Sequence, residues 1–242
     1  MKKQRLVKYI LSAALWILSA AIFTSARDPQ ENKQNVRPEP PVTVSPTSDK
    51  KGGAVKYSYE FSQPKFYIKH ILLEHDANGR GTITYEQLNG EVPVVEPIQL
   101  SPAAWARISA LWEALQFLDS DTNYQSSQQY AHLGTMRIGM ERGERKRVAE
   151  FNWTHNSNAA ALVAEYRRVA DQAILVFDIS VARENQPLNA PKLMEAMESL
   201  LKRNGLSDPQ QLVPLLRDLS TDEHVPLIAR NHALRLLKQI QK

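Results

Sequence analysis

The sequence predicts an α+β fold: an antiparallel sheet of two hairpins with helices packed on one face, followed by a short all-α tail. Three observations predict it. Residues 66–88 and 135–153 each carry two strand-like segments around a turn that contains glycine. A helical pattern of apolar residues follows each pair, and beyond residue 186 the periodicity is helical throughout. Alternating hairpins and helices are typical of an α+β layer.

The first hairpin is expected from Phe66–His75 and Thr82–Leu88, which flank the turn-rich segment 76–81. Ser101 and Pro102 then form the N-cap and first turn of a helix. Its apolar side chains fall on one stripe, made of Trp105, Ile108, Leu111, Trp112, Leu115 and Leu118.

The second hairpin is expected because Met136, Ile138 and Met140 alternate with small or polar residues, and a turn at 142–144 leads to the strand 148–153. A long helix follows over 157–183. The tryptophans at 105, 112 and 153 are interpreted as core residues rather than as a stacking platform.

The tail is expected to contain three helices. The first covers 188–203 and stops at Asn204-Gly205. The second is capped by Asp208 and begins at Pro209, and the third covers 225–240.

The N-terminus has the layout of a secretory signal peptide. A basic segment, 1–8, precedes the apolar stretch Tyr9–Phe23, and small residues at 24–26 offer a cleavage site. An uncleaved signal anchor is the alternative, because residues 9–26 are uncharged and of the minimum length to span a bilayer. Both place the rest of the chain outside the cytoplasm. The protein is therefore expected to be periplasmic or secreted, or anchored in the inner membrane, with membrane contact only through 9–26 if uncleaved.

Four parts are expected along the chain: the signal segment 1–26, a Pro-rich disordered linker 27–56, an α+β domain 57–185 and a helical tail 186–242. The linker has five prolines between 27 and 53, where three valines are the only large apolar residues. Such a segment buries too little apolar surface to offset the entropy of ordering it.

The charge distribution argues against nucleic-acid binding. The net charge of +4 equals the four basic residues of segment 1–26, which has no acidic residue. The remainder is balanced, with 26 basic and 26 acidic residues, and lacks the excess of cations that a phosphate backbone attracts. The absence of cysteine excludes thiol catalysis, disulfides and cysteine-ligated metals.

The segment 76–83 is similar to the start of an EF-hand calcium loop, with Asp76 at its first position and Asn78 at its third. However, Arg80 occupies a ligand position and Gln87 replaces the acidic residue that closes the loop. The segment is therefore interpreted as a hairpin turn, and no metal and no cofactor are expected. Asp76, Asn78 and His75 remain the candidate ligands if the turn does bind calcium.

No catalytic motif is recognisable, so the protein is expected to be a non-catalytic binding or interaction module. The alternative is an envelope hydrolase with a His/carboxylate site, for which His70, Glu74, His75 and Asp76 are the candidates if a cleft gathers them. A third possibility is a membrane-tethered structural protein that docks another envelope protein through its helical tail and exposes apolar side chains there.

Two stretches resemble known families. Residues 65–180 resemble uncharacterised secreted domains of bacterial envelopes, through Thr82-Ile83-Thr84-Tyr85, the helix start Leu100-Ser101-Pro102 and the stop Phe117-Leu118-Asp119. Residues 208–240 resemble a single HEAT-type helical repeat, which is fewer than a solenoid needs. The first resemblance implies an exported protein and carries no activity and no site residues.

Overall fold

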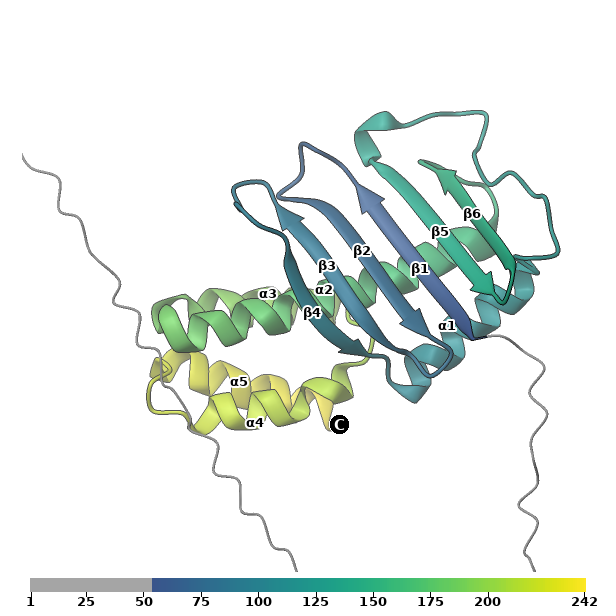
Figure 1. Ribbon diagram of the computed structural model, residues 1–242. Helices are drawn as coiled ribbons and strands as arrows, with labels where there is room; N and C mark the ends of the chain where they lie inside the picture. Colours follow the sequence, from purple (N-terminus) through teal and green to yellow (C-terminus); the bar gives the residue numbers. More distant parts are fainter. Residues whose placement is uncertain (1–53) are drawn as a thin grey trace, which may run out of the picture. The chain divides into compact units, whose positions relative to one another are not determined.

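Six β-strands form one antiparallel sheet in the computed structural model, which describes residues 54–242 (Figure 1). Their order across the sheet is β4-β3-β2-β1-β5-β6. The connection that contains helix α1 therefore leads from the edge strand β4 to β5, which lies between β1 and the other edge strand, β6. The α+β prediction is confirmed. The strands are β1 (Val55–Ser62), β2 (Ile68–Asp76), β3 (Arg80–Gln87), β4 (Val94–Gln99), β5 (Thr135–Arg142) and β6 (Arg145–Phe151).

The described residues also contain five α-helices and three short 3₁₀ turns. Ser101 caps α1 as expected, because its hydroxyl accepts a hydrogen bond from the Ala104 N–H at 3.1 Å. The α-helices are α1 (Pro102–Leu115), α2 (Ser157–Asn185), α3 (Ala190–Lys202), α4 (Val213–Thr221) and α5 (Leu227–Ile240). The turns are η1 (Ala131–Leu133), η2 (Pro187–Asn189) and η3 (Pro209–Leu212).

Two strands were not expected from the sequence. β1 begins at Val55, two residues inside the expected linker, and β4 precedes α1. β1 pairs with both β2 and β5, so it joins the two expected hairpins into one sheet. The hairpins are therefore parts of a continuous six-stranded layer.

The two faces of the sheet differ in polarity. Tyr57, Tyr59 and Phe61 of β1 are buried against the helices, whereas Lys56 and Glu60 lie on the opposite face. On that open face the charged side chains pair across strands, as in the contact of 2.7 Å between the Lys56 ammonium and the Glu74 carboxylate. The alternation of residue types thus fixes which face the helices cover.

Helix α2 connects the two hydrophobic cores of the described unit. It has 29 residues and is about 43 Å long, and it crosses behind the sheet and continues past β4 (Figure 1). Its buried residues up to Ile174 pack in the core beneath the sheet, whereas Leu175 and Ile179 pack in the core of the helical tail. The described residues, 54–242, accordingly form one compact unit.

A chain of hydrogen bonds crosses the core between the sheet and the helices. The Nδ1–H of His75 donates to the Asp76 carbonyl at 2.7 Å, which leaves Nε2 to accept from the Tyr166 hydroxyl at 2.8 Å. The Tyr166 oxygen in turn accepts from the indole N–H of Trp112 at 2.9 Å. Burial lowers the pKa of His75, so the neutral imidazole that this pattern requires is favoured.

None of the helices in the described residues is long and apolar enough to cross a membrane. The expected signal segment 1–26 and most of the expected linker lie outside the described residues.

Candidate functional site

The structure separates the four residues that were candidates for a hydrolase site. His75 lies in the core, while His70, Glu74 and Asp76 lie on the open face of β2. Each of these three has its own partner: His70 contacts Glu60 at 3.0 Å, Glu74 pairs with Lys56, and Asp76 accepts backbone hydrogen bonds. The structure therefore brings no two of the four into a common cleft.

The EF-hand-like segment forms the turn between β2 and β3. Asp76 Oδ1 accepts from the backbone N–H groups of Asn78, at 2.8 Å, and Arg80, at 2.9 Å. These bonds, that of Arg80 foremost, hold the pKa of Asp76 below its usual range. Gly79 takes a positive φ of 73°, which glycine adopts without strain. His75 points into the core, so the three candidate calcium ligands do not converge.

We expect millimolar calcium to leave the melting temperature unchanged, because the Asp76 carboxylate already accepts hydrogen bonds from backbone N–H groups of the turn. Replacing Asp76 with alanine should lower the melting temperature by about 2–4 °C, the shift that a loss of roughly 1 kcal/mol gives in a chain of this size. Asp121→Ala, at an exposed position, is the control and should change it little. A calcium-dependent rise of several degrees would show that the turn is a metal site.

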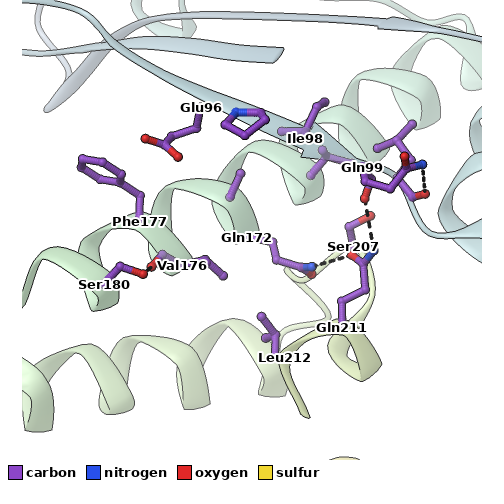
Figure 2. Close-up of a pocket in the computed structure, with 14 residues that line it drawn as sticks. Glu96, Ile98, Gln99, Gln172, Val176, Phe177, Ser180, Ser207, Gln211 and Leu212 are labelled. Atoms are coloured by element: carbon purple, nitrogen blue, oxygen red, sulfur yellow. Dashed lines mark hydrogen bonds between the residues drawn. The ribbon is translucent and has the colours of Figure 1, made fainter. Parts of the chain in front are cut away.

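One cavity lies where the helical tail meets the edge strand β4. It has a volume of about 290 Å³, and Figure 2 shows Gln172 of α2 and Gln211 of η3 directed toward each other within it. Gln172 Nε2 donates to Gln211 Oε1 at 3.1 Å, and Gln211 Nε2 donates to the Gln99 carbonyl at 3.1 Å. The Gln172 oxygen accepts from the Asp208 N–H at 2.9 Å. These amides bond to one another and hold the tail to the sheet, so we interpret this cavity as a structural joint.

A second concave region, which we call the aromatic groove, lies along the first half of α2. It consists of two adjoining cavities of about 520 and 560 Å³, and both are lined by Phe66 and Arg167. The larger cavity is lined by the residues that follow β6, by the start of β5 and by α2, and Arg167 is the only charged residue in its lining. The smaller is lined by the β1–β2 connection, by both of these strands and by α2. Cavities of this size and composition accommodate small ligands.

Aromatic side chains at the groove are exposed to solvent. Phe66 is 43% exposed and Trp153 is 41% exposed. The Trp153 indole packs edge to face against Tyr130, with ring centroids 5.3 Å apart. The expectation that Trp153 belongs to the core is wrong, because it follows β6 by two residues and lies at the rim of the groove.

The loops around the groove are fixed by side-chain hydrogen bonds. Gln63 Nε2 donates to the carbonyls of Ala131 and His132, at 3.0 and 2.9 Å, and so ties the β1–β2 connection to η1. Gly134 follows η1 with a φ of 88°, and a Cβ there would lie 2.7 Å from the Phe61 ring. The groove is thus built into the fold rather than formed by a free loop.

Arg167 has an unusual environment. Its guanidinium stacks over the Phe61 ring, with Cζ 4.9 Å from the centroid. Within residues 54–242 it forms no ion pair, and its polar neighbour is the Tyr59 hydroxyl, whose pKa burial raises and Arg167 lowers, whereas its neighbour Arg168 bonds Glu165 at 2.6 Å. Stacking leaves the N–H groups at the edge of the guanidinium free to donate. The groove therefore combines apolar walls with an unpaired cation, which is an arrangement for binding.

Sequence reasoning missed the groove because its residues come from segments far apart in the chain. Phe66 and Tyr67 were expected at the start of the first strand, but β2 begins at Ile68, so both aromatics lie in the β1–β2 connection and are exposed. No protein-family model matches this sequence, and no curated protein is significantly similar to it.

Proposed function

We propose that the protein is a non-catalytic binding module that acts outside the cytoplasm and holds a ligand with an apolar body in the aromatic groove. The observation that carries this proposal is the pair of adjoining cavities lined by Phe66 and Arg167. Export rests on the signal-like segment 1–26 and on the resemblance to secreted envelope domains. The groove offers phenols, cations and apolar walls, which is the chemistry of recognition rather than of bond cleavage.

Filling the groove tests this proposal. Ala164 is an exposed residue of α2 that lines the larger cavity, and Ala164→Phe should weaken binding of the neutral fluorophore N-phenyl-1-naphthylamine about tenfold or more. The added ring occupies the apolar space that the fluorophore needs. The measurement is a fluorescence titration of the purified protein.

The control is Ala110→Phe, since Ala110 is exposed on α1 and lines neither cavity. This variant should bind the fluorophore as the wild type does. Equal binding by both variants would place the fluorophore elsewhere, and a wild type that binds no fluorophore would remove the proposed function.

A second candidate function is docking of another envelope protein by the helical tail. It is favoured by exposed apolar side chains there: Leu188 is 85% exposed and Ile228 is 68% exposed. Crosslinking in intact cells should then capture a partner with the wild type and lose it with Ile228→Ser. Capture of the same partner by this variant would argue against the tail as the docking surface.

A further inference from the structure

A buried tyrosine lies in the wall of the smaller cavity of the groove, beside Arg167. Tyr59 has no exposed surface, and its ring stacks parallel to that of Tyr166 with centroids 5.4 Å apart. Tyr59 lines the cavity, and its hydroxyl is enclosed by protein beside the Arg167 guanidinium, which opposes the rise in the Tyr59 pKa that burial causes. Arg167 is thus positioned at the wall of this cavity by the Phe61 ring and the Tyr59 hydroxyl.

Two cations, Arg167 and Lys65, line this cavity, and neither forms an ion pair within residues 54–242. Asp171, one helical turn beyond Arg167, is the carboxylate of the lining and is not paired with it. With Asp171 ionised, the lining carries two positive charges and one negative charge. It therefore complements a ligand group with a single negative charge.

The larger cavity is the apolar half of the groove and adjoins the smaller cavity that the cations line. Phe66 and Arg167 belong to both linings, and the larger cavity beyond them is lined mainly by apolar groups, among them Met136, Val163 and Trp153. A molecule that places an anionic head at Arg167 can extend its apolar chain over Phe66 toward Trp153. The two cavities thus match the two ends of an amphiphile.

We propose that the aromatic groove binds a monoanionic amphiphile whose carboxylate accepts hydrogen bonds from Arg167 and Lys65 while its apolar chain occupies the larger cavity. This inference rests on the proposed function, since it names the ligand class of the same groove. A carboxylate offers two acceptor oxygens to the guanidinium and to the ammonium. A phosphate monoester carries close to two negative charges at neutral pH, which exceeds the net positive charge of the lining.

The test is displacement of N-phenyl-1-naphthylamine from the purified, natively processed protein by dodecanoate, dodecanol and dodecyl phosphate. Dodecanoate should bind at least tenfold more tightly than dodecanol. Arg167→Gln should reduce the affinity for dodecanoate to near that for dodecanol. Arg235→Gln, which removes an exposed charge on α5, should change neither affinity.

The outcomes separate this inference from the proposed function. Equal affinities for dodecanoate and dodecanol would overturn the inference while the groove remained a binding site. Tighter binding of dodecyl phosphate than of dodecanoate would overturn the choice of a carboxylate. If neither the fluorophore nor any of the three amphiphiles binds, both the proposed function and the inference fail.

Discussion

Replacing Tyr166 with phenylalanine will lower the free energy of unfolding by about 2–4 kcal/mol. The Tyr166 hydroxyl donates to His75 and accepts from Trp112 in a fully buried part of the core. Phenylalanine keeps the ring but leaves the imidazole nitrogen and the indole N–H without partners. Each unsatisfied buried group costs about 1–3 kcal/mol. Urea denaturation followed by circular dichroism measures the change.

The matched control is the neighbouring tyrosine on which Tyr166 stacks. Tyr59 is equally buried, but the polar neighbour of its hydroxyl is the exposed Arg167, which water can also solvate, so Tyr59→Phe should change stability little. The comparison isolates hydrogen bonding, because both substitutions remove the same atom from the same layer. Similar losses in the two variants would show that packing around the hydroxyls, rather than their bonds, determines stability here.

Replacing Glu165 with glutamine will lower the free energy of unfolding by about 2–3 kcal/mol. Glu165 is 7% exposed, and its Oε1 accepts from Arg107 at 3.2 Å and from Arg168 at 2.6 Å. Removing one partner of a buried ion pair costs about 3–5 kcal/mol. We expect a smaller loss because Arg107 and Arg168 are partly exposed and water screens their charges.

This substitution also affects the joint between the sheet and the tail. Arg107 uses its remaining N–H groups to donate to the Ser207 carbonyl at 2.7 Å, which ties α1 to the start of the tail. Glu184→Gln is the control, since Glu184 is an exposed residue of α2, the helix that also contains Glu165. Substitutions at exposed positions change the free energy of unfolding by no more than about 0.5 kcal/mol. A loss this small for Glu165→Gln would show that the network contributes little, and urea denaturation distinguishes the two results.

The sequence predicted the parts of the fold that carry a regular local pattern. Ser101-Pro102 marked the start of α1, and the alternation of Met136, Ile138 and Met140 marked β5. β1 was missed although Tyr57, Tyr59 and Phe61 alternate with polar residues, because the preceding residues are polar and proline-rich. β4 was missed because it is short and contains Pro97, which strand propensity disfavours.

The candidate site could not be predicted in the same way. The groove depends on how β1 pairs with β5 and on where α2 crosses the sheet, and neither follows from local periodicity. In the sequence, Arg167 is one of two adjacent arginines in a predicted helix, and both would be expected to face solvent. Only the structure distinguishes it from Arg168, which Glu165 neutralises. His70 and His75 were candidates because of their chemistry. In the structure His75 hydrogen-bonds within the core, and His70 contacts Glu60 on the open face of the sheet.

The central claim is that the aromatic groove is the binding site, and mapping amide chemical shifts by NMR during a dodecanoate titration tests it most directly. The account predicts that perturbed amides cluster in the β1–β2 connection around Phe66, in the segment around Trp153 and in α2 around Arg167. Amides of α4 and α5 should remain unperturbed. Shifts confined to the helical tail, or no shifts at saturating dodecanoate, would contradict the account.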